Sequence, residues 1–227
     1  VLLGGLGNDV FVDPVGGYWD ASVAFEQDRL NGGAGIDTVR VMNDSRLDLT
    51  SFASRSFLGI ERIDLGSGDN TLVVDFDRAL ESVRDDGTLR VDGDAGDRVV
   101  VVDAWTPGTP AGGYVDWVRS EGEATVHLEV AEGITVERHQ TATAAVDNLV
   151  GGSGINDVFI FHESTLTADD QVDGAGGDDV VRLVGGGSFD LNNLDMTAID
   201  GVYLADGATV ILGPDSVPVH GSFFDDT

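Results

Sequence analysis

The sequence contains neither cysteine nor lysine, and these two absences exclude several classes of chemistry. Without cysteine the chain forms no disulfide, binds no metal through thiolates and has no cysteine nucleophile. Because all 12 basic residues are arginine, phosphate-loop lysines, Schiff-base lysines and polybasic patches are excluded as well. Nucleic acid is therefore not an expected partner. No apolar run approaches the roughly 18 residues of a membrane-spanning helix, so no transmembrane segment is expected.

Acidic residues and glycine are what the sequence has in excess. The 227 residues include 41 Asp and Glu and 32 Gly, and the formal net charge is -29. Carboxylates at this density repel one another, so we expect compaction to require neutralisation, most simply by a divalent cation. The glycine content predicts frequent turns, and the 41% of hydrophobic residues is typical of a globular protein.

Two stretches of the sequence recur in the same order. Residues 2–12 match 149–160 with one residue added, and residues 31–41 match 172–183. Shorter matches continue in this order further along both copies. A recurrence of this kind is the sequence signature of a repeat architecture, in which each repeat buries its apolar side against the next.

The duplication predicts three segments. We expect a first β-rich unit at 1–87, a β insert with a degenerate Gly/Asp turn at 88–147, and a second β-rich unit at 148–227. Residues 1–7 already lie inside a repeat motif, which indicates an excerpt from a longer chain. Neighbouring modules of the same long chain are therefore expected partners.

The spacing of the apolar residues predicts an all-β fold. Strand-like runs of three to six residues alternate with Gly and Asp turns, as in a parallel β-solenoid resembling a β-roll, whose coils bury their apolar sides by stacking. An antiparallel sandwich gives similar spacing, particularly in the insert. Helical periodicity is weak, and only Phe76 to Val83 favours a short helix, with Asp75 as its N-cap.

A nine-residue motif carries the chemistry that the sequence suggests. Gly4 to Val12 and Gly32 to Arg40 both read G-G-x-G-x-D-x-U-x, in which U is a large apolar residue. The glycines permit a tight turn whose carbonyl oxygens point toward a common centre, and the aspartate adds a carboxylate. Calcium takes about six to eight oxygens at about 2.3–2.6 Å, so carbonyls and carboxylates of stacked turns suit it.

This motif is the calcium-binding nonapeptide of RTX proteins, and the chain resembles that family of toxins, proteases, lipases, giant adhesins and S-layer proteins. Asp173 to Val181 matches with Asp for the first glycine, Gly151 to Phe159 matches with Asn156 for the aspartate, and 92–97 is a shortened variant. The resemblance implies that Ca²⁺ is bound by the following side chains and glycine carbonyls: Gly5, Gly7, Asp9, Gly33, Gly35, Asp37, Asp94, Asp97, Asn156, Asp157, Asp173, Gly174, Gly176 and Asp178.

The spacing of the motifs departs from the family. Members with a regular calcium roll have nonapeptides in unbroken tandem, whereas here the two motifs of each pair start 28 and 22 residues apart. Calcium binding then requires that another coil stacks on each turn. A plain structural turn is an equally good interpretation for Asn156 and Asp157, and a slightly better one for Asp94 and Asp97.

Nothing in the sequence indicates catalysis. The four histidines form no zinc-spaced set, no G-x-S-x-G elbow is present, and the carboxylates lie in turns and not in apolar surroundings. We therefore expect that the segment is not an enzyme. Trp105, Tyr114 and Trp117 in the insert could form a platform for a sugar, but packing in the core or over a face of the solenoid is the favoured interpretation.

The resemblance implies a calcium-binding structural or adhesive segment of a large secreted or cell-surface bacterial protein. Such a segment would leave the cell by type I secretion and fold on calcium binding outside it; a cell-surface or glycan target is an additional candidate partner. Two alternatives remain open: the non-catalytic calcium-binding tail of a secreted hydrolase or toxin, and a carbohydrate-binding module. Sequence upstream of Val1 would distinguish an adhesin from a hydrolase tail.

Overall fold

The computed structural model describes residues 2–12, 29–42, 44–83, 87–205, 207–212 and 218–220. The fold is all-β, and parallel sheets form a β-solenoid of about 8 turns. The expected fold class is therefore confirmed. The chain divides into two compact units, Val1–Val136 and Glu137–Thr227, called unit 1 and unit 2.

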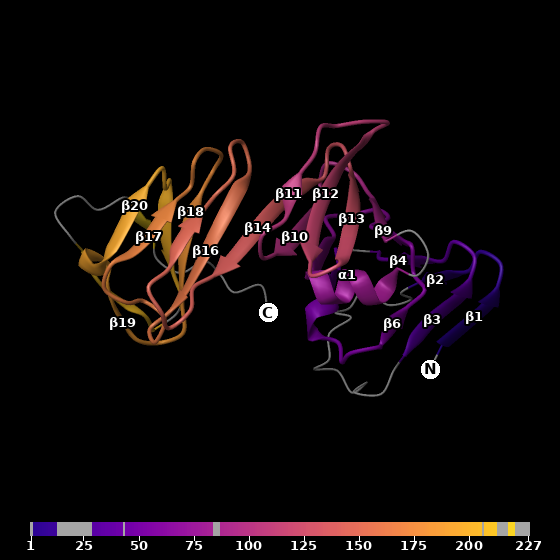
Figure 1. Cartoon of the computed structure of the whole chain (residues 1–227), viewed down its shortest axis with the longest axis horizontal. Coiled ribbons are helices and arrows are strands. Elements are labelled where there is room, and N and C mark those ends of the chain that lie inside the picture. Colours follow the sequence, from indigo (N-terminus) through magenta and orange to yellow (C-terminus); the bar gives the residue numbers. More distant parts are fainter. Residues whose placement is uncertain are drawn as a thin grey trace. The chain divides into compact units, whose positions relative to one another are not determined.

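Successive coils of unit 1 contribute strands to three sheets, so segments about one coil apart lie side by side (Figure 1). The first sheet consists of β1 (Leu2–Leu6), β3 (Leu30–Ala34) and β6 (Phe57–Leu58). The second consists of β2 (Val10–Val12), β4 (Thr38–Arg40), β7 (Arg62–Asp64), β9 (Thr88–Asp92), β13 (Ala124–Ala131), β12 (Tyr114–Glu121) and β11 (Thr106–Pro107). The third contains β5 (Arg46–Asp48), β8 (Thr71–Val74) and β10 (Arg98–Val102).

The segment expected as an insert is only partly irregular. β9 is parallel to β7, β10 is parallel to β8, and β13 is parallel to β9, so these strands continue the coils of the solenoid. β12 is antiparallel to both β11 and β13, so β12 and β13 form a hairpin at the end of the seven-stranded sheet. Among the described residues, antiparallel pairing therefore occurs only between β11 and β13, in part of the segment where it was suspected.

Unit 2 has the same plan with shorter coils. One sheet consists of β15 (Asn148–Val150), β17 (Asp170–Asp173) and β20 (Leu194–Thr197). A second contains β14 (Thr135–Thr141), whose first two residues belong to unit 1, together with β16 (Asn156–His162), β18 (Val180–Val184), β21 (Gly201–Leu204) and β23 (Val219–His220). A third pairs β19 (Ser188–Asp190) with β22 (Thr209–Ile211).

Two 3-10 helices mark the duplication at equivalent places in the coils. Leu49–Ser51 follows β5 in unit 1, and Leu191–Asn193 follows β19 in unit 2. The preceding residues, Asp48 and Asp190, cap them by accepting a backbone N–H with the carboxylate. The chain therefore leaves the third sheet in the same way in both units.

One α-helix, α1 (Phe76–Ser82), lies where the sequence predicts it. The Asp75 carboxylate accepts the N–H of Arg78 at 2.7 Å, which satisfies a donor that the first helical turn leaves unpaired. The helix buries Phe76 and Ala79 against unit 1. Among the described residues no helix is long and apolar enough to cross a membrane.

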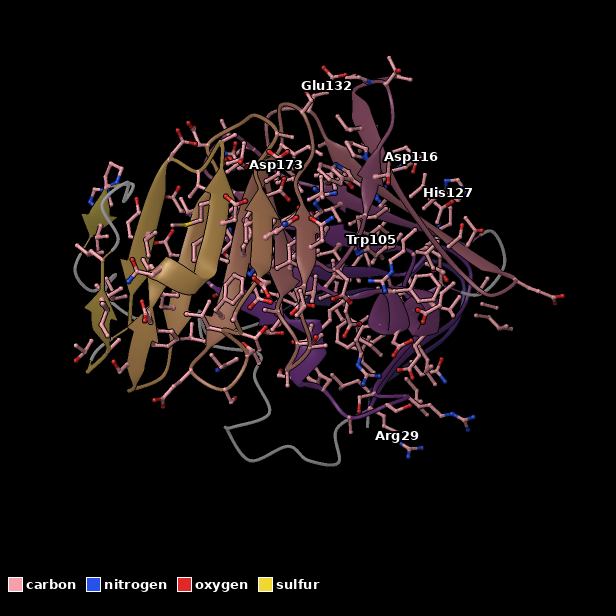
Figure 2. The ribbon with its side chains drawn as sticks, turned by 60° about the vertical axis from the view of Figure 1, so that its left-hand side comes forward. Arg29, Trp105, Asp116, His127, Glu132 and Asp173 are labelled. Carbon is pink, nitrogen blue, oxygen red and sulfur yellow. The ribbon has the colours of Figure 1, made fainter. Side chains whose placement is uncertain are left out.

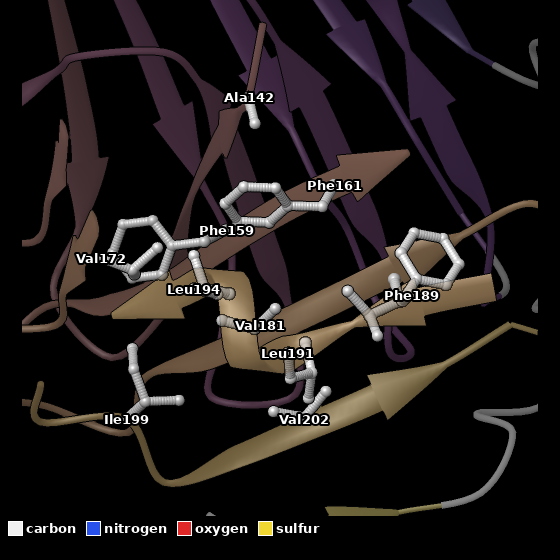
Figure 3. Close-up of a cluster of buried hydrophobic side chains, with 11 residues drawn as sticks. Ala142, Phe159, Phe161, Val172, Val181, Phe189, Leu191, Leu194, Ile199 and Val202 are labelled. Carbon is white, nitrogen blue, oxygen red and sulfur yellow. The ribbon is translucent and has the colours of Figure 1, made fainter. Parts of the chain in front are cut away.

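The core follows the strand register. In unit 1, Val39, Ile63 and Val91 lie opposite one another on β4, β7 and β9 and are 0% exposed. In unit 2, Phe159 lies opposite Val181, in the cluster shown in Figure 3. Each such side chain contributes roughly 1.5–3 kcal/mol when it is fully buried. Most of this burial exists only when coils stack.

Candidate metal-binding turns

The two motifs of each unit lie on neighbouring coils. In unit 1, β1 and β3 place Gly5 opposite Gly33, and Gly7 donates its N–H to the carbonyl oxygen of Ala34 at 2.8 Å. In unit 2, β15 and β17 pair, and Gly154 donates its N–H to the carbonyl of Gly176. The long spacing between motifs is therefore the length of one coil, and the turns stack as calcium binding would require.

The first glycine of each motif permits the close approach of the next coil. A Cβ at Gly32 would lie within 3.0 Å of the Gly59 carbonyl oxygen and of the Asp37 carboxylate. Gly174 would meet the carbonyl oxygen of Ala198 in the same way. The second glycine has a different reason: Gly33 has φ 105, in the left-handed region that favours glycine.

The motif aspartates of unit 1 form a ladder between coils. Asp9 donates its backbone N–H to the Asp37 Oδ1 at 2.8 Å, and Asp37 donates its backbone N–H to the Glu61 Oε2 at 2.9 Å. The three residues occupy equivalent positions directly before β2, β4 and β7. We call Asp9, Asp37 and Glu61 the unit 1 ladder. Glu61 lies outside any motif and was not among the predicted ligands.

The same ladder in unit 2 corrects the register of the motif. Asp157 donates its N–H to the Asp179 Oδ1, and Asp179 donates its N–H to the Asp200 Oδ2, both at 2.8 Å. Asp157, Asp179 and Asp200 form the unit 2 ladder. Asp178, the residue predicted from the sequence, is exposed, whereas Asp179 is 0% exposed and takes the place of Asp37. The motif therefore begins at Gly174 and not at Asp173.

The shortened variant at 92–97 belongs to another corner of the coil. There Ser45 donates its N–H to Asn70 Oδ1, and Asn70 donates its N–H to Asp97 Oδ1, each at 2.9 Å. Asp97 is 1% exposed, and burial raises its pKa above the ordinary range. The exposed Asp94 accepts the N–H of Gly96 at 3.0 Å, within its own turn. These two aspartates therefore do not meet the motif turns of β1 and β3.

Three ladder carboxylates bury an oxygen that has no hydrogen-bond donor: Asp9 Oδ2, Asp37 Oδ2 and Asp179 Oδ2. An unpaired buried carboxylate is costly, so a proton or a cation is expected to neutralise it. Burial raises the pKa of Asp179 to about 6, and the neighbouring charges of Asp157 and Asp200 act in the same direction. The N–H groups that donate to this carboxylate oppose the shift.

The donors at these turns fit calcium in kind. The carbonyl oxygens of Gly5 and Gly7 are directed toward the neighbouring turn at Gly33 and Gly35, and the Asp9 and Asp37 carboxylates each have an unpaired oxygen. Among the described residues, no group of three or more His, Asp or Glu side chains converges as a metal site. An ion held here would therefore take most of its oxygens from the backbone.

In unit 2 a guanidinium faces the first ladder carboxylate. Arg138 on β14 lies opposite Asp157 on β16. Its Nε is 2.6 Å from Oδ1 of Asp157, and a terminal nitrogen is 3.1 Å from Oδ2. The side chains are 10% and 0% exposed. The guanidinium also lies 3.4 Å from the carbonyl oxygen of Val150. Asp157 is therefore neutralised by a residue of the chain itself.

The remaining predicted side-chain ligands of unit 2 accept backbone N–H groups. Asn156 Oδ1 accepts the N–H of Asp178 at 3.1 Å, and Asp173 Oδ1 accepts the N–H of Ala175 at 3.0 Å. Unit 1 has the equivalent of the first bond, because Asn8 accepts an N–H from the next coil. These side chains support the turns whether or not an ion is present.

The aromatic residues of the hairpin region are mostly core. Trp105 is 0% and Trp117 5% exposed, which confirms the core interpretation for both. Tyr114 is half-buried beneath the guanidinium of Arg90, 4.5 Å from the ring centre. Figure 2 shows Asp116 near His127 on the same hairpin, where the imidazole Nδ1 and a carboxylate oxygen are 2.9 Å apart.

No family model matches the sequence, and neither a curated protein nor a solved structure is significantly similar to the chain. The RTX resemblance therefore rests on the nonapeptides alone.

The raised pKa of Asp179 predicts an unusual pH dependence in calcium-free buffer. Because the pKa in the folded state, about 6, exceeds the ordinary value of 3.8, the folded state binds more protons between these values. The contribution of Asp179 to the free energy of unfolding should therefore rise as the pH falls from about 7 toward about 4. Asp179→Asn keeps the acceptor for the Asp157 N–H and should remove this contribution. Urea unfolding across this range would test it; identical slopes for both proteins would contradict it.

Proposed function

We propose that the chain is a structural β-solenoid segment of a larger secreted or cell-surface protein, and that it binds calcium at the stacked Gly/Asp turns of unit 1. The observation that carries the proposal is the pair of unpaired, buried carboxylate oxygens of Asp9 and Asp37 on turns that stack coil upon coil. The role is structural or adhesive and not catalytic. The RTX-type nonapeptides at these same turns support it.

Calcium is the cation that this chemistry favours. The available donors are hard oxygens from carboxylates and glycine carbonyls, and the chain has no cysteine for softer metals. A bound Ca²⁺ would supply positive charge that offsets part of the net charge of -29. Extracellular calcium sites typically have dissociation constants of about 10⁻⁴–10⁻³ M, so the turns would stay empty in a cytosol and fill outside it.

The role of a spacer follows from the architecture. A solenoid buries its core between coils, so it can be extended by adding coils or modules without a new fold. The same features suit the calcium-binding tail of a secreted hydrolase, which is the runner-up. The carbohydrate-binding alternative gains no support, because the indole rings of Trp105 and Trp117 are buried.

Calcium is expected to raise the melting temperature of unit 1. At a calcium concentration about ten times the dissociation constant, each occupied site adds about 1.4 kcal/mol to the free energy of unfolding. Asp37→Asn keeps the acceptor for the Asp9 N–H but removes a charge, so it should remove the calcium site at this turn without unfolding the chain. The exposed Glu123→Gln, in a hairpin turn of the same unit, is the matched control.

Thermal melting in EGTA and in millimolar calcium, together with calorimetric titration, measures both effects. The proposal predicts a calcium-dependent shift in the wild-type chain and in Glu123→Gln, and a smaller one in Asp37→Asn. Equal calcium stoichiometry in Asp37→Asn and wild type would remove Asp37 from the site. Melting curves that chelation leaves unchanged would show that the turns are structural only.

A further inference from the structure

All the ladders run in the same direction along the chain. They differ in what bonds to the side chain of the first residue. In each ladder a residue donates its N–H to the side chain on the following coil, so the first side chain lacks a donor from an earlier coil. In unit 2 the first carboxylate, Asp157, receives Arg138 instead. At the second corner the first member is Ser45, whose hydroxyl donates to the Met42 carbonyl oxygen at 2.6 Å.

In a fourth ladder the first side chain also has a hydrogen-bond donor within its own unit. Asp147 donates its N–H to Asp170 Oδ1 at 2.9 Å, and the Asp147 carboxylate accepts the N–H of Thr143 at 2.7 Å. Asp9 is different. The Oδ1 atoms of Asp37 and Asp179 each accept an N–H from the preceding coil, whereas the described residues supply no donor to the Asp9 carboxylate, whose Oδ2 is buried. The unit 1 ladder is therefore open at Asp9.

The strands around Asp9 are open at the same edge. Among the described residues, β1 pairs only with β3, and β2 pairs only with β4. The row of side chains formed by Leu2, Leu30 and Phe57 is 55%, 4% and 2% exposed from the first coil inward. Leu3 and Leu6 are 71% and 91% exposed. Apolar side chains and unpaired strand edges therefore coincide with the open ladder.

We propose that this edge, formed by Asp9, β1 and β2, accepts a further β-solenoid coil that belongs to a neighbouring module. The coil would run parallel to β1 and β2, donate a backbone N–H to the Asp9 carboxylate, and cover the apolar row at Leu2. The inference rests on the proposed role as a segment of a larger protein, but it does not require calcium.

Strand direction and charge argue against a second copy of this chain as the occupant. A copy stacked head to tail would place β23 (Val219–His220), the last described strand of its second sheet, on this edge, and two chains of charge -29 would meet there. An antiparallel pairing of two β1 edges would not place an N–H at Asp9 in the ladder register, and it would bring two chains of charge -29 together.

The test is a fusion that supplies the missing coil. A copy of residues 29–55 placed directly before Val1 keeps the spacing between Leu30 of the copy and Leu2 equal to that between Leu30 and Phe57. Hydrogen exchange of the amides of β1 and β2 should become at least about tenfold slower than in the unfused chain. A fusion of the same residues in scrambled order is the control, and Asp9→Ala in the true fusion should reduce the protection.

Exchange is measured in EGTA and again in calcium, so that the two proposals fail separately. Protection in both media supports the inference even if calcium has no effect on melting. Unchanged exchange of β1 and β2 in the true fusion, or equal protection by the scrambled one, would overturn it. The inference would also be overturned if the unfused chain sediments as a dimer and the double substitution Leu3→Lys with Leu6→Lys makes it a monomer. A second copy would then be the occupant.

Discussion

Replacing Arg138 with methionine is expected to lower the free energy of unfolding of unit 2 by about 3–5 kcal/mol. The substitution keeps an apolar side chain of similar length but leaves the Asp157 carboxylate, which is 0% exposed, without its cation. A buried charge that loses its partner bears the full cost of desolvation. Native-state hydrogen exchange of the amides of β16 would measure the loss within unit 2.

The matched control is Arg40→Met. Arg40 and Asp64 form an ion pair at 2.7 Å, but the side chains are 45% and 27% exposed. Exposed pairs contribute about 0–1 kcal/mol, so unit 1 should change little. Combining Arg138→Met with Asp157→Asn removes the buried charge and should recover most of the stability. Equal losses for the two arginine variants, or no recovery in the double variant, would contradict a buried ion pair.

Gly174→Ala is expected to destabilise unit 2 by about 3 kcal/mol or more. The added Cβ would lie within 3.0 Å of the Ala198 carbonyl oxygen and the Asp179 carboxylate, and the backbone of the next coil cannot retreat without breaking its strand pairing. Gly186→Ala is the control in the same unit, because its nearest neighbour is the Gly207 carbonyl oxygen at 3.9 Å. It should change stability by less than about 0.5 kcal/mol.

Urea unfolding of both variants, monitored by far-ultraviolet circular dichroism, would compare them. A Gly174→Ala chain as stable as Gly186→Ala would mean that the coils stack less closely at this turn than the structure indicates.

The fold class followed from the sequence because one physical pattern dominates it. Short apolar runs between Gly and Asp turns cannot bury themselves alone, so they must stack. The spacing of 28 and 22 residues between the two motifs of each pair is the length of one coil, which only the structure reveals. The hairpin of β12 and β13 was harder to predict. Its strands have the same β-like composition as the coils, and only the pairing partner reveals their direction.

The candidate site was only partly predictable. Asp178 and Asp179 are adjacent and come as a pair after Gly177, so the sequence alone could not tell which one the register turns inward. Glu61 and Asn70 carry ladder bonds from segments without the motif. Arg138 gave no signal, because its partner is 19 residues away and only the pairing of β14 with β16 brings them together.

The salt bridge of Arg138 with Asp157 also bears on how the two units respond to their medium. A guanidinium held on the same polypeptide has an effective concentration that does not change when the solution is diluted or a chelator is added. The carboxylate of Asp157 in unit 2 therefore stays neutralised by Arg138 whatever the composition of the solution. The corner at Asp9 has no such tethered charge among the described residues, so its neutralisation depends on what the surrounding solution or a neighbouring coil provides.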